Sequence, residues 1–137
     1  ILTTLMRNID PRIAVFSLSF RDLKDYEPNE RIFYHLDTCL LYLPKANLFI
    51  LYPRAFRDGT VGFLKCLGDV EILSKEEAET FVCNSVTVGD VIFTPKIKHD
   101  RVRKIFTGAG YQVIEHDMSE FMKSGGAVKC LTLEMSD

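Results

Sequence analysis

The feature that most constrains the fold of this chain is an order of secondary structure that the sequence predicts twice. In each passage, two strands joined by a short turn precede a helix and a third strand. The first passage predicts strands over 34–43, 48–52 and 70–73 with a helix over 55–67, and the second predicts strands over 85–88, 91–94 and 111–115 with a helix over 98–107. The passages begin about 50 residues apart and share little sequence, so the repeat is one of pattern. The chain is therefore predicted to be an α/β protein built of ββαβ units.

Turn and capping residues mark the ends of these elements. The stretch from Pro44 to Asn47 separates the first two strands, and Gly89-Asp90 forms a tight turn in the second passage. Between the two passages, Ser74 and Glu77 have the spacing of a capping box, which predicts a short helix that runs to about residue 81.

Both ends of the chain predict fragments of further units. A helix end over 2–9 and a strand over 13–18 make a partial unit at 1–18, and a strand over 127–135 opens another. The two whole units then occupy about 34–73 and 84–116. A ring of such units buries its inner strands only when it is closed. The chain is thus expected to be part of one larger domain, with its edges covered by a missing amino-terminal half or by self-association.

Composition and charge exclude several classes of partner. Apolar residues make up 47% of the chain, which suits a folded core, and the net charge of −2 comes from charges spread over the whole length. This distribution provides neither a basic stripe for nucleic acid nor a polybasic cluster for a membrane surface. The longest apolar runs, such as Leu40 to Leu43, are far shorter than the roughly 20 residues that span a bilayer. Small-molecule chemistry or protein contact remains.

Four cysteines occur without any CxxC pair, at Cys39, Cys66, Cys83 and Cys130. Their spacing fits neither a zinc knuckle nor a compact disulfide scaffold. The thiols are therefore expected to be reduced, as they are in the cytoplasm, and no metal or other cofactor is expected.

Two short motifs carry side chains suited to catalysis. His35 and Asp37 stand two apart on a predicted strand, so both side chains are expected on one face, where an imidazole can pass protons beside a carboxylate. Gly125 and Gly126 precede a predicted strand that carries Cys130, and glycines let backbone amides approach a ligand closely. Each motif alone also has an ordinary structural interpretation, because most free cysteines are small buried apolar residues and most His-x-Asp pairs on strands are structural.

Three stretches, in the same order, resemble one family. Residues 33–43 (FYHLDTCLLYL), 76–86 (EEAETFVCNSV) and 120–133 (EFMKSGGAVKCLTL) are similar to stretches of the amidinotransferase and dimethylargininase branch of the pentein superfamily, which also includes arginine deiminase. The resemblance covers nearly the whole chain from about Arg12. It implies a five-bladed α/β propeller of ββαβ units around a central substrate channel, of which this chain would hold about half.

The resemblance also implies a reaction and its residues. A cysteine thiolate attacks the guanidino carbon of arginine or a substituted arginine, releases an amine or ammonia, and leaves a covalent thiouronium intermediate. Cys130 matches that nucleophile, and His35 matches the histidine that protonates the leaving amine and then activates water or an acceptor amine. Asp37 matches a carboxylate that holds the guanidinium.

Other site residues follow from the same resemblance, with one departure. Asn84, Gly125 and Gly126 lie in shared stretches and are expected to contribute to substrate binding. The family's remaining acidic residues lie in its amino-terminal half, and none of the acids before His35 has a matching context: Asp10, Asp22, Asp25 and Glu27. A complete site is therefore expected to need that half.

Two alternatives remain open from the sequence. The chain could be a non-catalytic pentein fragment that acts as a binding or assembly module and keeps the motif as a relic. It could also be an unrelated α/β domain with an accidental match. Hydrolysis and amidino transfer are not separated either, because both pass through the same covalent intermediate.

Overall fold

The computed structural model describes residues 12, 14–26, 28, 31–133 and 135 of the chain. Its helices and strands, with 3-10 helices labelled η, are, in chain order, η1 (Leu23–Asp25), α2 (Leu36–Cys39), β1 (Leu40–Leu43), η2 (Pro44–Ala46), β2 (Leu48–Leu51), η3 (Pro53–Ala55), α3 (Thr60–Lys65), β3 (Asp69–Ile72), α4 (Lys75–Glu79), β4 (Val86–Val88), β5 (Val91–Pro95), α5 (Asp100–Gly108), β6 (Gln112–His116), α6 (Ser119–Met122) and η4 (Lys129–Leu131). Within this described part, no helix has both the length and the apolar character needed to cross a bilayer.

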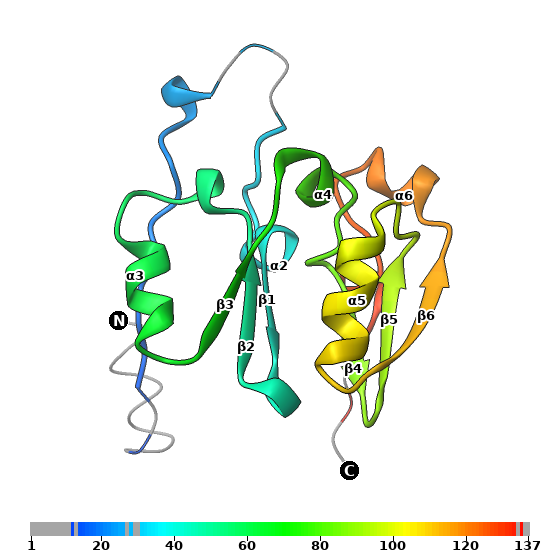
Figure 1. Cartoon of the computed structure of the whole chain (residues 1–137). Coiled ribbons are helices and arrows are strands. Elements are labelled where there is room, and N and C mark those ends of the chain that lie inside the picture. The colour runs from blue at the N-terminus through cyan, green and yellow to red at the C-terminus, as the bar shows by residue number, and fades with distance from the viewer. Residues whose placement is uncertain (1–11, 13, 27, 29–30, 134, 136–137) are drawn as a thin grey trace.

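Two three-stranded sheets of the same topology lie side by side (Figure 1). In the first sheet, β2 pairs antiparallel with β1 and parallel with β3, and α3 connects the parallel strands. In the second, β5 pairs antiparallel with β4 and parallel with β6, and α5 makes the crossover. The predicted α/β class is confirmed, and the order ββαβ occurs twice.

Backbone contacts at the turns explain why the first unit forms. Asn47 adopts a left-handed conformation with φ 46° after η2, and its carbonyl accepts a hydrogen bond from the amide of Asp69 at 3.0 Å. A side chain on Gly68 would place its Cβ 2.4 Å from that carbonyl oxygen, so a glycine is required where β3 joins β2. The predicted capping box is confirmed, because the Ser74 hydroxyl accepts from the Glu77 amide and the Glu77 carboxylate accepts from the Ser74 amide.

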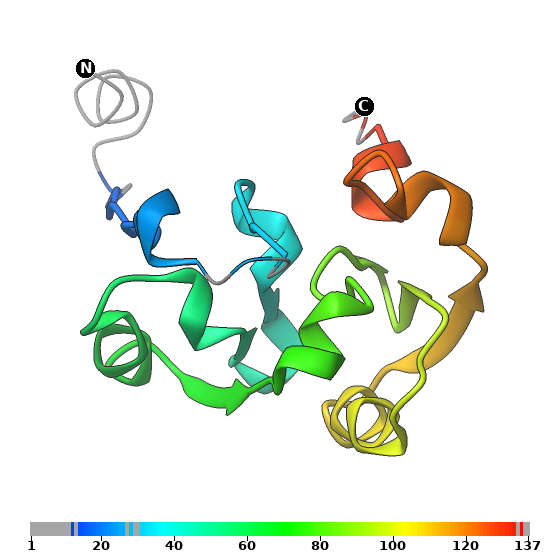
Figure 2. The same cartoon turned by 90° about the horizontal axis from the view of Figure 1, so that it is seen from above.

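The two units share one hydrophobic core. It includes Leu43, Ile50 and Leu51 from the first sheet and Ile92 and Phe106 from the second unit, all of them fully buried. A smaller cluster consists of Phe81 and Met118 together with Ala127 and Val128 of the carboxy-terminal segment, residues 123–133. Figure 2 shows α3 and α5 along one side of the sheets, with α2 and the carboxy-terminal segment on the other side.

Several predicted strands are wrong, and hydrogen bonds that involve side chains explain two of these differences. Residues 34–39 do not extend β1, because the Thr38 hydroxyl and amide both donate to the carbonyl of His35 and start the short helix α2. The described residues of 127–135 contain η4 and no strand, because the amides of Ala127 and Cys130 donate to the side chain of Asn84.

Other parts of the prediction differ in extent. The helix expected over 55–67 is divided into η3 and the shorter α3, with Gly59 at φ 92° between them. Described residues 14–18 form no strand, and the helix end expected over 2–9 lies outside the described residues.

Candidate active site

Cys130 differs from two of the other three cysteines in its environment. Its thiol lies in η4 and is exposed, whereas Cys39 and Cys83 are buried. Burial raises the pKa of the Cys39 thiol to about 12, with a further contribution from the Asp37 carboxylate, and burial raises the pKa of Cys83 well above its ordinary value. Those two thiols remain neutral and inert at physiological pH. Cys66 is exposed, but it follows α3 on the opposite side of the sheets from the carboxy-terminal segment (Figure 2).

A buried asparagine lies directly behind the Cys130 sulfur. Asn84 has no exposed surface. Its Nδ2 donates to the Cys130 Sγ at 3.3 Å and to the carbonyl oxygen of Asp37 at 3.3 Å. Its Oδ1 accepts from the amides of Ala127 at 2.9 Å and Cys130 at 3.3 Å. One side chain therefore joins the segment that carries the thiol to the helix that carries Asp37.

A carboxylate lies next to the same sulfur. The Oδ2 of Asp37 is 3.9 Å from the Cys130 Sγ, although 93 residues separate the two in the chain. The carboxylate is partly exposed, so it is accessible to a ligand. A nucleophilic sulfur beside a carboxylate suits a planar cation, which the carboxylate can hold by charge-assisted hydrogen bonds while the sulfur faces its carbon.

His35 lies immediately before α2 and is exposed. Its ring packs against the Tyr34 ring in a T-shaped arrangement, with 4.7 Å between the ring centroids. The Tyr34 hydroxyl in turn approaches Gly125, where an added Cβ would lie 2.2 Å from that oxygen. His35 is thus linked through Tyr34 to the loop that precedes Cys130. Tyr34 was not predicted as a site residue, and its place beside the histidine in FYHLDT is the only sequence signal for it.

Gly126 is packed against the cysteine. A Cβ at this position would lie 2.9 Å from the Cys130 Cβ and 3.2 Å from its sulfur. The structure thus brings Asp37, Asn84, Gly126 and Cys130 into direct contact. No group of three or more potential metal ligands occurs among the described residues.

Known proteins with similar sequences carry out chemistry on guanidino compounds. No protein-family model matches the chain. It is 38% identical over 109 residues to the bifunctional arginine dihydrolase/ornithine cyclodeaminase AgrE of Nostoc, a match that covers 77% of this chain and 15% of AgrE. It is 32% identical over 123 residues to the N(G),N(G)-dimethylarginine dimethylaminohydrolase of Mycobacterium tuberculosis, which covers 89% of this chain and 39% of that enzyme.

A solved structure supports the same relationship. The amino-terminal domain of ArgZ, an arginine dihydrolase of cyanobacteria crystallised as a Cys-to-Ser mutant with its substrate, superimposes with a TM-score of 0.78 at 29% identity. The match covers 96% of this chain and 45% of that one. The chain is a homologue of the pentein guanidine-modifying enzymes. The expected resemblance is confirmed, and the chain spans less than half the length of these pentein relatives.

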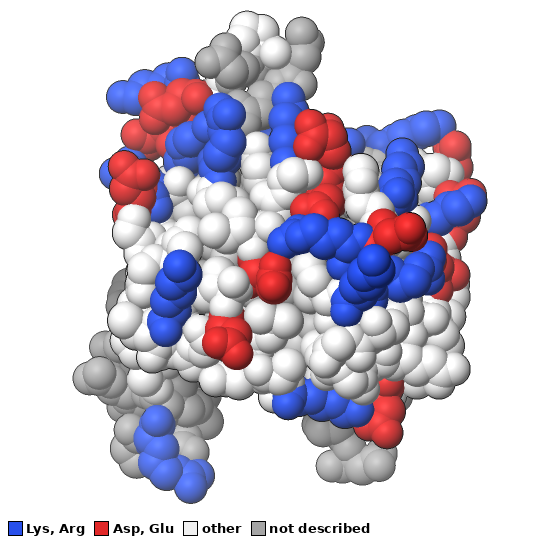
Figure 3. All heavy atoms as spheres, viewed as in Figure 1, with Lys and Arg blue, Asp and Glu red and all other residues white. Residues whose placement is uncertain are grey.

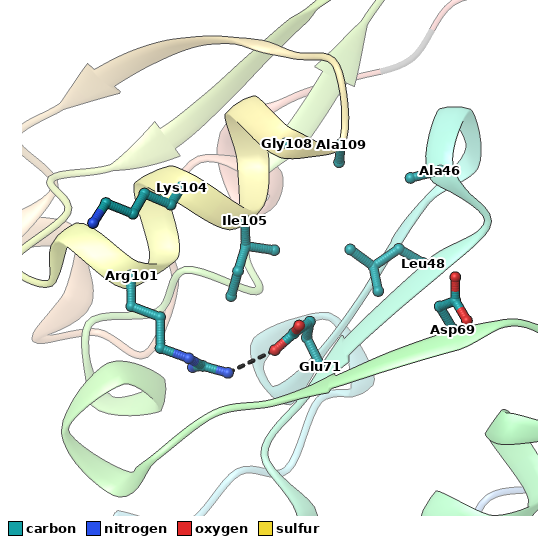
Figure 4. Close-up of a pocket in the computed structure, with 9 residues that line it drawn as sticks. All are labelled: Ala46, Leu48, Asp69, Glu71, Arg101, Lys104, Ile105, Gly108 and Ala109. Carbon is teal, nitrogen blue, oxygen red and sulfur yellow. Dashed lines mark hydrogen bonds and ion pairs between the residues drawn. The ribbon is translucent and has the colours of Figure 1, made fainter.

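The chain also has a groove away from Cys130 (Figure 4). It has a volume of about 580 Å³ and lies between β3 and α5, where the apolar side chains of Leu48 and Ile105 meet. Arg101 crosses it and pairs with Glu71, with 2.6 Å between Nη2 and Oε2. Basic and acidic side chains are interspersed on this face of the molecule (Figure 3). The groove therefore has both acidic and basic side chains, and its charge does not favour one class of ligand.

We expect Gly125→Ala to displace the Tyr34 side chain. Gly110→Ala is the matched control, because it should introduce the same backbone strain. Both glycines have φ 86°, a conformation in which alanine costs about 1 kcal/mol of folding stability. A Cβ at Gly110 has an ordinary 3.9 Å contact with Lys45, whereas a Cβ at Gly125 would displace the Tyr34 hydroxyl. Urea unfolding would compare the stabilities, and NMR would follow the ring protons of Tyr34 and His35. Unchanged ring signals in Gly125→Ala would contradict the contact.

Proposed function

We propose that this chain provides the nucleophile-bearing part of a guanidine-modifying hydrolase that acts on arginine or a substituted arginine. The observation that carries the proposal is the exposed Cys130 sulfur, which accepts an N–H from Asn84 and lies 3.9 Å from the Asp37 carboxylate. In this role Asp37 holds the guanidinium, and the loop at Gly125 and Gly126 allows the substrate to approach. A reducing cytoplasmic location suits such a thiol.

In the first half of the proposed reaction, the Cys130 thiolate attacks the central guanidinium carbon. A carbon–sulfur bond forms, and a tetrahedral adduct places its electron pair on nitrogen. One carbon–nitrogen bond then breaks, and the leaving amine takes a proton from the imidazolium of His35. The product of this step is a free amine or ammonia and a covalent thiouronium on Cys130.

In the second half, His35 is neutral and acts as a base. It takes one proton from a water molecule that attacks the thiouronium carbon. The carbon–sulfur bond then breaks and releases the thiolate, and the urea product loses its second proton to solvent. Water rather than an amine is proposed as the acceptor, because the relatives are an arginine dihydrolase and a dimethylaminohydrolase. A structure of the ArgZ amino-terminal domain is described as covalently bound to a reaction intermediate, which supports a covalent step.

The proposal includes an amino-terminal half that completes the site. The further acids of the family are assigned to that half, and the chain would form about half of a five-bladed propeller. The 45% coverage of the ArgZ domain supports this division. Activity of a complete enzyme is therefore assigned to a longer protein or assembly that contains this chain.

Selective labelling tests the proposal. We expect chloroacetamidine to alkylate Cys130 about tenfold faster than chloroacetamide of the same shape, because the Asp37 carboxylate attracts the cationic amidinium. In Asp37→Asn the preference should fall close to one, and His35→Ala should report any contribution of the imidazole. Mass spectrometry of the labelled peptides would give both rates, in this chain and in a longer protein that contains it.

Cys66 is the matched control, because its thiol is exposed, directly follows α3 and donates to the Gly62 carbonyl. It should show no preference for the amidinium reagent. Equal preference at Cys66 and Cys130 in both proteins would contradict the catalytic proposal. The alternative of a non-catalytic binding or assembly module would then be favoured.

A further inference from the structure

The turn that holds Asn84 is itself fixed on several sides. The Asn84 amide donates to the carbonyl of Phe81 at 2.8 Å, and Phe81 has a left-handed φ of 59°. Phe81 belongs to the small hydrophobic cluster under the carboxy-terminal segment, and the Arg31 guanidinium lies 4.5 Å from the centre of its ring. A left-handed phenylalanine is unusual and persists only where the surroundings determine it. The surroundings of Phe81 therefore fix the backbone turn from which the Asn84 side chain projects.

The neighbours of Asn84 determine which end of its amide faces the sulfur. The amides of Ala127 and Cys130 can only donate, so they require the oxygen. The carbonyl of Asp37 can only accept, so it requires the nitrogen. The Nδ2 group is consequently on the side of the Cys130 Sγ, and it presents an N–H to that sulfur.

These contacts use the full hydrogen-bonding capacity of the side chain. A primary amide has two N–H donors and two oxygen lone pairs, and each has a partner in the protein. Because Asn84 has no exposed surface either, its side chain has neither an opening nor a spare atom for a substrate. Its influence on a reaction at this site must act through Cys130.

We propose that Asn84 is a positioning residue for the Cys130 nucleophile, an inference that rests on the proposed function. Its oxygen holds the backbone at both ends of the segment 127–130, and its nitrogen donates to the sulfur. An N–H donor at this position stabilises negative charge on the sulfur. It thereby offsets the repulsion between that charge and the nearby Asp37 carboxylate. Asn84 thereby holds the sulfur beside a carboxylate that the substrate needs.

Asn84→Asp separates the two functions of the side chain. The aspartate keeps an oxygen for the amides of Ala127 and Cys130, but a second oxygen replaces the N–H that faces the sulfur. We expect iodoacetamide to alkylate Cys130 about tenfold more slowly in this variant, measured against Cys66 in the same molecules. The buried thiols of Cys39 and Cys83 report global unfolding, because they become reactive only when the main core opens.

Each outcome of this experiment has a distinct meaning. A fall in the ratio of Cys130 to Cys66 labelling, with Cys39 and Cys83 still protected, supports the positioning role. An unchanged ratio overturns it. If Cys130 in the unsubstituted chain reacts no faster than Cys66, the result counts against the proposed function, and the change caused by Asn84→Asp still decides the role of Asn84.

A second measurement covers the case in which Asn84→Asp unfolds. Hydrogen exchange on the unsubstituted chain should show protected amides at Ala127 and Cys130, because the Asn84 oxygen accepts from both. The amide of Leu133, an exposed residue beyond the segment 127–130, serves as the reference. Exchange at Ala127 and Cys130 as fast as at Leu133 would overturn the proposal.

Discussion

Cys130→Ser is expected to lower guanidine turnover at least about 10³-fold in a protein that contains this chain together with its amino-terminal half. A serine hydroxyl keeps the size and the contacts of the thiol, but it is a far weaker nucleophile near neutral pH. The Asn84 amide and the Asp37 carboxylate remain in place, so substrate binding should change little. Release of ammonia from arginine, or of dimethylamine from dimethylarginine, would measure the rate, and calorimetry would measure binding.

Cys66→Ser provides the matched control for this substitution. Cys66 is also exposed, but it follows α3 and its contact is with the carbonyl of Gly62. Turnover in Cys66→Ser should stay within about twofold of the unsubstituted protein. If Cys130→Ser retained comparable turnover, a covalent role for Cys130 would be untenable.

Arg101→Ala is expected to lower the free energy of unfolding by about 2 kcal/mol. Arg101 on α5 joins the two units, because its Nη1 lies 2.8 Å from the Glu77 carboxylate on α4 and its Nη2 lies 2.6 Å from Glu71 on β3. Nη2 also donates to the carbonyl of Ile72. The side chain of Glu77 is only 7% exposed, so removal of the arginine leaves a nearly buried carboxylate without its cation. Urea unfolding would measure the change.

Arg57→Ala is the control for an exposed pair. Arg57 lies 2.8 Å from Asp22, with both side chains about half exposed. Its loss should cost at most about 0.5 kcal/mol, because solvent screens such pairs. Equal losses in the two variants would show that the buried carboxylate of Glu77 does not depend on Arg101.

The sequence was sufficient for elements whose hydrogen bonds are local or follow a regular ladder. The strands around Ile50 and Ile92 have the apolar content of buried strands, and the capping box at Ser74 is complete within four residues. The sequence was insufficient where backbone amides bond to a distant side chain and not to a neighbouring strand. Asn84 accepts from the amides of Ala127 and Cys130, which lie 43 and 46 residues further along, and this pairing leaves no strand there.

In the candidate site, too, local motifs were predictable and contacts between distant residues were not. The resemblance predicted His35, Asp37 and Cys130 as site residues from their motifs, and the strand that was expected to align the first two is absent. The proximity of Asp37 to Cys130 depends on how the two units pack, and no local pattern encodes a contact across 93 residues. The contact of Tyr34 with Gly125 was likewise invisible, because it joins two segments that have no common periodicity.

The segment that carries Cys130 is held by side chains and turns, whereas the sheets beneath it are held by ladders of backbone hydrogen bonds. The contacts that attach it to the rest of the chain include the Asn84 side chain, a backbone hydrogen bond from Lys129 to the carbonyl of Asn84, and the small cluster around Phe81. Such a segment can detach while both sheets stay intact, since few bonds break together. The Cys130 thiol would then move away from the Asp37 carboxylate at temperatures well below the unfolding temperature of the sheets. Heating would therefore abolish activity before it unfolds the protein.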